Sequence, residues 1–220
     1  MPFSPLIFFL LILVTAFLLA FIQVGILSLA IHKLGLSTGA LFLLLFGALL
    51  GSNINIPIAT VTRRGPTPPP VHPAFRLGLL RPSPTPTQRT RIAVNLGGAV
   101  IPVGFAAYLW LHHEPDPGPA LAGIALVAAI SYASSRPVPG MGIGMPLFVG
   151  PLAAAAVALL LSPEGSAPLA YIAGTLGVLI GADLLRLPDI PRLGTPVASI
   201  GGAGTFDGIY ITGIVAVLLA

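Results

Sequence analysis

Charged residues are spaced so far apart that most of the chain consists of long uncharged stretches. None precedes Lys33, none lies between Lys33 and Arg63, and none lies between Asp116 and Arg136. A helix needs about 20 apolar residues to cross a hydrocarbon core of about 30 Å. Hydrophobic residues make up 55% of the 220 residues and charged residues 7%. So few charged residues cannot form the polar surface of a water-soluble fold of this size. The sequence therefore predicts an integral membrane protein.

Proline, glycine and charged residues divide the apolar sequence into seven predicted membrane spans. The expected fold is all-α, a polytopic transmembrane helical bundle in a single domain covering residues 1–220. The stretch from Phe3 to Ile31 lacks the basic start and small-residue cleavage site of a signal peptide, so we expect a retained span. The predicted spans are 4–31, 38–60, 92–111, 118–134, 146–161, 168–186 and 204–220.

Two connecting segments are rich in helix-breaking residues. The 63–91 loop contains many prolines and most of the arginines, which predicts an extended, solvated cytoplasmic loop. The segment from Pro137 to Pro146 alternates glycine and proline with apolar residues. It is either a plain cytoplasmic turn or a loop that enters the membrane, where irregular backbone must line a cavity or be buried in protein.

Charge sets the expected orientation. Alternating spans place the N-terminus, the 63–91 loop, the turn at Arg136 and the 187–203 loop on one side, with every basic residue except Lys33. The positive-inside rule then predicts a cytoplasmic N-terminus and an outside C-terminus. Membrane orientation explains the net charge of +4 and the pI near 10.1 better than nucleic-acid binding does. We expect the lipid bilayer, and no nucleic acid, as a partner.

The chain has no cysteine, which excludes disulfides, thiolate catalysis and cysteine-ligated metals. The turn from His112 to Asp116 contains two histidines and two acids, and such side chains are metal ligands. A polar interfacial turn after Trp110, a residue type that anchors at headgroup level, is the favoured interpretation. We therefore predict neither a metal site nor a cofactor.

Two parts of the sequence resemble each other and predict a duplicated helical hairpin with both copies in the same orientation. Asn53 and Val103 occupy, in the first copy, the registers that Asp183 and Asp207 hold in the second. The hairpin itself therefore does not require the acids, which favours a functional reason for them. Chance similarity among segments rich in Gly, Ala and Leu is the alternative. The matching segments are 47–53 with 177–183 and 95–99 with 199–203.

Asp183 and Asp207 are acids within predicted membrane segments, where an ionisable side chain costs about 2.5–3.5 kcal/mol at a helix centre and is a functional candidate. They lie near the cytoplasmic ends of consecutive spans. The helix dipole favours a carboxylate at Asp207, by a helix N-terminus, and disfavours one at Asp183. Two neighbouring carboxyls share one proton, as an aspartyl protease requires: one activates water and the other polarises the carbonyl.

The residues around the second acid suit a peptide substrate. The glycines from Gly201 to Gly208 permit close backbone approach, so an extended substrate strand can reach Asp207. The predicted substrate-binding residues in this motif are Gly204, Thr205, Phe206 and Gly208.

Asp183, a short loop and the Gly204-Thr-Phe-Asp207 sequence resemble the two-aspartate core of the presenilin, signal-peptide-peptidase and prepilin-peptidase group of intramembrane aspartyl proteases. The resemblance covers about residues 176–214 and implies that both aspartates are catalytic. Phe206 stands where that group has glycine. The Pro-Leu element of the group would correspond to Met145, Pro146 and Leu147, which adds these three to the predicted substrate-binding residues.

The whole chain more closely resembles an uncharacterised family of prokaryotic integral membrane proteins, a domain of unknown function that shares the Gly-Gly-Ala-Gly-Thr-Phe-Asp-Gly sequence at 201–208. That resemblance implies a prokaryotic cell membrane and a helical membrane architecture. It implies no activity.

Other interpretations stay open. Asp207 or Thr205 would be a suitable cap for the last helix, and Asp183 has the spacing to pair with Arg186. A proton- or cation-coupled transporter would use the same aspartates, with Asn53, Asn55 and the 137–146 segment along its path, and at this size would be expected to act as a homodimer. A non-catalytic membrane scaffold is the third interpretation.

Overall fold

The computed structural model describes residues 25, 28–29, 33–35, 37–62, 89–138, 142–202 and 208–220. Ser37 caps the first complete helix, because its side chain accepts a hydrogen bond from the Ala40 nitrogen. In chain order the helices are α2 (Thr38–Gly51), the π-helical turn η1 (Leu96–Val100), α4 (Ile101–His113), α5 (Pro117–Ser134), α6 (Val149–Leu161), α7 (Ser166–Val178), the π-helical turn η2 (Leu179–Asp183), the 3₁₀ segment η3 (Leu184–Asp189), α8 (Ile190–Leu193) and α9 (Gly208–Leu219). The strands are β1 (Asn55–Thr62), β2 (Arg89–Asn95), β3 (Arg136–Val138), β4 (Gly142–Gly144) and β5 (Val197–Ile200).

The protein is mostly helical, but the all-α prediction is wrong because strands replace parts of the predicted spans. The helix expected over 38–60 ends at Gly51, and 55–62 is a strand. The segment expected to be helical from 92 is a strand as far as Asn95. Isoleucine, valine and threonine alternate with other residues there, which suits a pleated strand better than a helix.

The predicted count of about seven spans is not supported. Within the described residues, two helices are long and apolar enough to cross a membrane, Pro117–Ser134 and Ser166–Leu193. They match the predicted spans 118–134 and 168–186. The helices found within the predicted spans 146–161 and 204–220 are α6 and α9, which are shorter. The predicted span 4–31 lies almost wholly outside the described residues.

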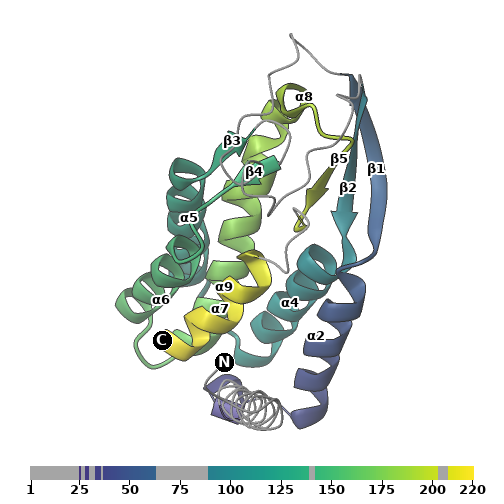
Figure 1. Cartoon of the computed structure of the whole chain (residues 1–220). Coiled ribbons are helices and arrows are strands. Elements are labelled where there is room, and N and C mark those ends of the chain that lie inside the picture. Colours follow the sequence, from purple (N-terminus) through teal and green to yellow (C-terminus); the bar gives the residue numbers. More distant parts are fainter. Residues whose placement is uncertain are drawn as a thin grey trace, which may run out of the picture.

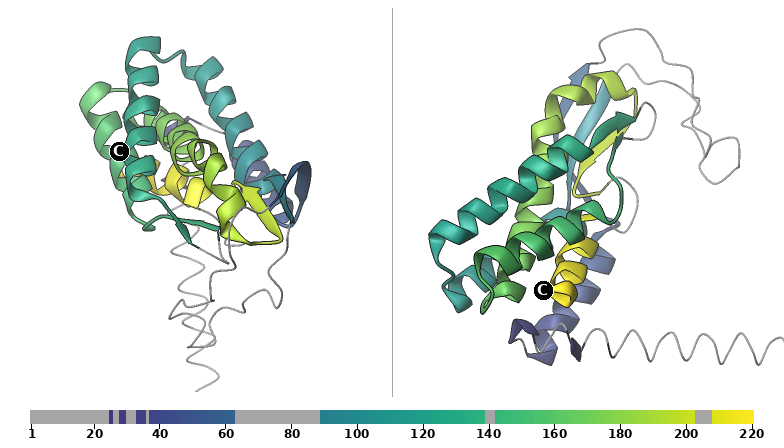
Figure 2. Two further views of the ribbon diagram at one scale, coloured as in Figure 1. Left: turned by 90° about the horizontal axis from the view of Figure 1, so that it is seen from above. Right: turned by 90° about the vertical axis from the view of Figure 1, so that its left-hand side faces the viewer.

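A three-stranded sheet lies at one end of the helices, in the order β1-β2-β5 (Figure 1). β1 and β2 are antiparallel, from Asn55 opposite Asn95 to Thr62 opposite Arg89. β2 and β5 are parallel, with Arg91 opposite Val197. Figure 2 shows the strands at the end opposite the C-terminus, so the sheet extends the bundle along its length.

The inner face of the sheet packs on the segment that follows α7. Ile92 and Ile200 form a hydrophobic cluster with Ile190 and Leu193 of α8. The 137–146 segment, predicted to be a turn or a re-entrant loop, forms the two-stranded β3/β4 ribbon, with 139–141 outside the described residues. Ile143 of this ribbon packs against the same cluster. The ribbon thus covers the junction between sheet and helices.

Helix α7 is the centre of the bundle, and all but one of its residues are buried. It runs antiparallel to α9. Thr212 of α9 lies against Gly174, since a Cβ at Gly174 would be 3.2 Å from the Thr212 methyl carbon. At the far end the Ser166 hydroxyl donates to the Ala220 carbonyl at 3.1 Å. Small residues permit this close helix contact, as in membrane helix pairs.

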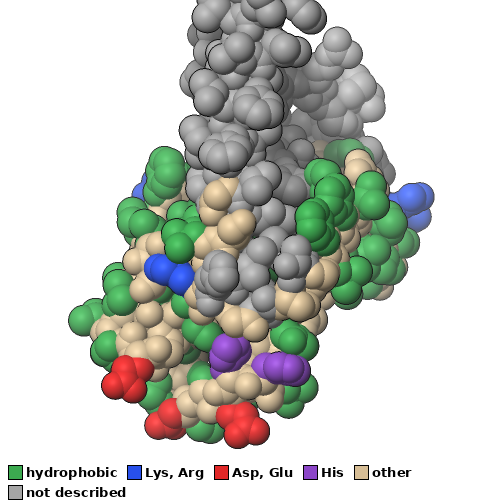
Figure 3. Space-filling model, turned by 90° about the horizontal axis from the view of Figure 1, so that it is seen from below, with side chains coloured by type: hydrophobic (Ala, Val, Ile, Leu, Met, Phe, Trp, Pro, Cys, Tyr) green, Lys and Arg blue, Asp and Glu red, His purple; other side chains and the backbone are tan. Residues whose placement is uncertain are grey.

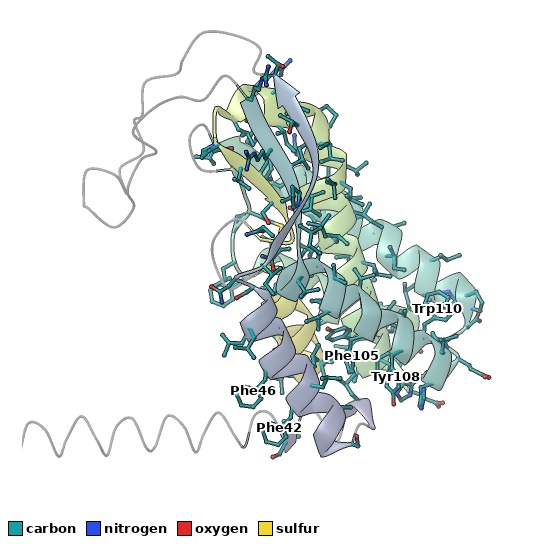
Figure 4. All side chains as sticks on the ribbon, turned by 90° about the vertical axis from the view of Figure 1, so that its right-hand side faces the viewer. Phe42, Phe46, Phe105, Tyr108 and Trp110 are labelled. Atoms are coloured by element: carbon teal, nitrogen blue, oxygen red, sulfur yellow. The ribbon has the colours of Figure 1, made fainter. Side chains whose placement is uncertain are left out.

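The two ends of the bundle differ in charge, and the surface between them is apolar. Glu114, Asp116 and Glu164 lie in the turns between α4 and α5 and between α6 and α7, and Figure 3 shows acidic side chains and histidines gathered at this end. The sheet end contains arginines, which belong to β2, β3, η3 and α8. Phe42 and Phe46 project outward from α2 and stack on each other (Figure 4). Large apolar side chains are highly exposed on several helices, including Leu43 (76%), Leu111 (75%) and Leu160 (82%).

Arg186 joins η3 to the C-terminal end of α5. Its guanidinium donates to the carbonyls of Tyr132 and Ser135, each at 2.7 Å, and lies 4.1 Å from the centre of the Tyr132 ring. It also contacts the Asp189 carboxylate at 3.3 Å. A cation at this position donates to carbonyls at the C-terminal end of α5, where the helix lacks its own backbone donors, and opposes the negative end of the helix dipole.

We predict that Arg186→Met lowers the free energy of unfolding by about 2–3 kcal/mol, because methionine keeps the apolar stem and loses charged hydrogen bonds. The measurement is thermal or denaturant unfolding of the detergent-solubilised protein. Arg192→Met is the control, since Arg192 has a side chain 78% exposed and lies 4.0 Å from Asp189. Equal destabilisation by the two substitutions would show that the contacts of Arg186 with the end of α5 do not stabilise the protein.

Candidate functional site

Asp183 is the last residue of the π-helical turn η2, at the point where α7 leaves regular helical geometry. Gly181, two residues earlier, packs on α5 so closely that a Cβ there would lie 2.1 Å from the Ala128 carbonyl oxygen. A π-helical turn inside a longer helix often marks a functional site, because the extra residue redirects the side chains that follow. Asp183 itself is partly buried.

Gly201 contacts Asp183 directly. The Gly201 N–H donates to Oδ2 of Asp183 at 2.7 Å, across a separation of 18 residues. Gly201 has a φ of 73°, in the left-handed region, and a Cβ there would lie 2.7 Å from the Ala99 nitrogen. Both the backbone conformation and the close approach require glycine. The turn after β5 therefore presents a backbone donor to the carboxylate.

The start of α9 lies beside the same place. Ile209 is buried in one hydrophobic cluster with Val178 and Ala182, the residue before Asp183. Since Thr212 lies against Gly174, the antiparallel register sets Gly208 level with Val178. Five residues of helix separate Val178 from Asp183, or about 7 Å along the axis. The 203–207 segment thus begins beside the turn that contacts Asp183 and ends at the face of α7 that leads to Asp183.

The structure describes some of the predicted site residues and not others. Asp207, Gly204, Thr205 and Phe206 lie outside the described residues. Gly208 is the first residue of α9. Met145 packs against the hydrophobic cluster that contains Ala182 and Ile209, and its predicted role in substrate binding stays a prediction. Pro146 and Leu147 are exposed in the turn that begins α6, where the Pro146 carbonyl accepts from the Val149 nitrogen at 3.2 Å.

The interpretation that Asp183 pairs with Arg186 is wrong. Among the described residues, the carboxylate partner of Arg186 is Asp189, and its other donors are used at the end of α5. The bond that the structure gives Asp183 comes from the Gly201 backbone. Among the described residues, Asp183 is thus held by a backbone donor and not by a cation.

An asparagine network, not anticipated from the sequence, supports the turn that bears Gly201. Asn95 Nδ2 donates to the Ser52 carbonyl at 2.7 Å and to Oδ1 of Asn55 at 3.1 Å, and Asn95 Oδ1 accepts from the Gly98 nitrogen at 2.8 Å. The Ser199 hydroxyl donates to the same Asn55 oxygen. A Cβ at Gly202 would lie 2.9 Å from the Asn95 Cβ. The Asn95 side chain therefore packs directly against the Gly201–Gly202 turn and supports it.

The signal for this network was present in the sequence. Residues 89–95 alternate in the pattern of a strand, and Asn95 ends that strand two residues before the glycine pair Gly97-Gly98. An asparagine at such a boundary is a favourable helix N-cap, which is the role that its contact with Gly98 gives it.

The chain matches the model of one protein family, described as "Protein of unknown function (DUF1614)", over residues 49–219. The chain belongs to this family. The match begins near the end of α2 and includes the sheet, Asp183 and the Gly201 turn. No curated protein and no solved structure matches the chain.

The histidine-rich turn of this DUF1614 chain holds structural contacts. The His113 ring nitrogen Nε2 lies 3.0 Å from the Leu34 carbonyl, and the His112 ring stacks on Tyr108 at 4.2 Å. Asp116 caps α5 through the Gly118 nitrogen. The described residues contain no group of three potential metal ligands among His, Cys, Asp and Glu.

We predict that Asn95→Asp destabilises this DUF1614 chain by about 2–3 kcal/mol. The substitution keeps the shape but removes both Nδ2 donors, so carboxylate oxygens would face the oxygens of Ser52 and Asn55 in a buried position. Asn55→Asp is the matched control, because the Asn55 oxygen is an acceptor that aspartate retains. Unfolding measurements on both variants check this, and equal losses would contradict the donor role of Asn95.

Proposed function

We propose that this protein is an integral membrane protein with an aspartyl protease-like site, in which Asp183 and Asp207 cleave a membrane-embedded peptide. The observation that carries the proposal is that Gly201, six residues before Asp207, donates a hydrogen bond to the Asp183 carboxylate, while Ile209, two residues after Asp207, is buried in one hydrophobic cluster with Ala182. No cofactor is required by this chemistry.

The apolar surface and the polarity of the ends support membrane insertion. Only 28% of α5 is buried inside the structure, although the helix has a mean hydropathy of 1.4. A core helix of a water-soluble protein would be covered on most of its surface, whereas lipid can cover α5. The arginine-bearing end then faces the cytoplasm and the acidic end, with the C-terminus, faces outside.

Chain connectivity supports the aspartate pair. Asp207 is bonded to Gly208, so their Cα atoms are about 3.8 Å apart, and Gly208 lies level with Val178. On the other side, Gly201 is hydrogen-bonded to Asp183 and is six residues from Asp207. These two tethers favour a position of Asp207 on the same side of α7 as the Asp183 carboxyl, and the proposed chemistry requires the two acids to be close enough to share a proton.

The neighbouring groups have suitable chemistry for peptide hydrolysis. The Gly201 N–H fixes the orientation of the Asp183 carboxyl group, so the oxygen that does not accept this bond is available to a water molecule. β5 is an edge strand that leads directly into Gly201, and its outer edge carries backbone groups that an extended peptide can pair with. Met145, which packs against the cluster that contains Ala182, would offer an apolar contact to such a peptide.

We predict that Asp183→Asn and Asp207→Asn each reduce cleavage of a membrane-peptide substrate by at least about a thousandfold, because neither amide can take a proton from water. The assay is cleavage of single-span peptides in proteoliposomes, analysed by mass spectrometry. Asp116→Asn is the control, since asparagine caps a helix as well as aspartate does and Asp116 lies at the other end of the molecule. Full cleavage by either site variant would contradict the proposal.

One observation favours the transporter as a second candidate. The buried hydroxyls of Ser131, Thr175 and Thr212 have no hydrogen-bond partner among the described residues, and they lie in α5, α7 and α9, around the helix that leads to Asp183. Unpartnered hydroxyls inside a bundle can bind water or a cation along a path. Proton- or cation-dependent flux in liposomes, lost in Asp183→Asn without any peptide cleavage, would favour transport over proteolysis.

The proposed orientation gives a separate prediction. Because the natural chain has no cysteine, single cysteines report on one position each. We expect Arg192→Cys to react with a membrane-impermeant maleimide from the cytoplasmic side, and the exposed Glu164→Cys to react from the outside. Labelling of both from the same side would show that the two ends do not lie across a membrane.

A further inference from the structure

The outer face of the β1/β2 ribbon combines two arginines with two threonines. Arg89 and Arg91 are exposed while Thr90 and Ile92 between and after them are buried, so the alternation of the strand puts both arginines on the outer face. Thr62 lies opposite Arg89 and Thr60 lies opposite Arg91. Directly opposed residues share a face of the sheet, so two guanidinium groups and two hydroxyls point the same way.

This face has no acidic partner within the part of the chain that the structure describes. The ion pairs there both involve Asp189, which contacts Arg186 and Arg192. The β5 residue opposite Arg91 is Val197, an apolar residue. The face is therefore a set of hydrogen-bond donors with a positive charge, which is the composition that suits a phosphate group.

The depth of this face is set by contacts with the helices. Arg186 binds the end of α5, which is one of the two membrane-length helices. Ile92, next to Arg91, packs with Ile190 and Leu193, just beyond Arg186 in the chain. Two leucines with exposed side chains, Leu184 (39% exposed) and Leu185 (51% exposed), come immediately before Arg186 in the chain. The arginine face thus lies next to the end of α5, where lipid headgroups would be if that helix crosses the bilayer.

We propose that the outer face of β1 and β2, with Arg89, Arg91, Thr60 and Thr62, binds the phosphate of an anionic phospholipid headgroup in the cytoplasmic leaflet. The two guanidinium groups and the two threonine hydroxyls share the lone pairs of the two non-ester phosphate oxygens as hydrogen-bond donors. The site requires that the chain lies in a membrane. It does not require that Asp183 and Asp207 are catalytic.

The test measures lipid binding to the full chain in an uncharged detergent. The probes are short-chain phosphatidylglycerol, short-chain phosphatidylcholine and glycerol phosphate, added separately and followed by native mass spectrometry. We expect phosphatidylglycerol to bind more tightly than phosphatidylcholine, and glycerol phosphate to bind weakly because it lacks acyl chains. Equal binding of the two lipids, or tighter binding of glycerol phosphate, would overturn the proposal.

Substitutions distinguish binding at a specific site from attraction of the lipid by net charge alone. Arg89→Gln and Arg91→Gln each should weaken phosphatidylglycerol binding about fivefold, and the double variant about 25-fold. Thr60→Val with Thr62→Val removes hydroxyls without changing charge and should weaken binding about threefold. Arg192→Gln removes the same charge elsewhere and should change binding by at most about twofold, because Arg192 already lies near Asp189. An equal loss in Arg192→Gln and Arg91→Gln, with no loss in the threonine variant, would show that only net charge matters.

Discussion

The parallel pairing of β2 with β5 is the contact on which the rest of the structure depends. It joins residues more than a hundred positions apart and aligns Ala93 with Ser199 and Val94 with Ile200. Both strands then lead into glycine pairs, and the pairing brings these turns against each other, so that Gly201 packs on Ala99 and donates to Asp183. The buried Thr90 hydroxyl, which donates to the Thr195 carbonyl at 2.7 Å, fixes the other end of the same pairing.

The sequence predicted the helices well where apolar runs are both long and unbroken. α5 agrees with the predicted span within one residue, and α7 with its continuation covers the predicted 168–186. It failed at the strands, because total hydrophobicity does not distinguish a strand from a helix. The alternation of isoleucine from Ile54 to Ile58 was a strand signal, but the pairing of β2 with β5 depends on contacts distant in sequence, which local patterns do not encode.

At the candidate site the sequence identified Asp183 by the cost of an acid in an apolar segment, and that argument needs no partner. It did not identify Asn95, whose importance comes from three hydrogen bonds to residues on other elements. Arg186 was considered only as a partner for Asp183, since spacing along a helix was the available guide. Its real partners, Ser135 and Tyr132, belong to the preceding helical hairpin, and only the packing of η3 on α5 brings them within reach.

The glycine pairs of the two predicted copies of the hairpin pack differently against the preceding helix. In the first half, Gly97 lies directly on the end of α2, where a Cβ would be 2.0 Å from the Ala48 carbonyl oxygen and 2.3 Å from the Ser52 nitrogen. In the second half, Gly201 meets the end of α7 through the carboxylate of Asp183, in the register where the first half has the exposed Asn53. Close backbone packing alone therefore suffices to join a helix end to such a turn. Because the first half is held together without an acid, the joining of a helix end to such a turn does not by itself require a carboxylate at position 183.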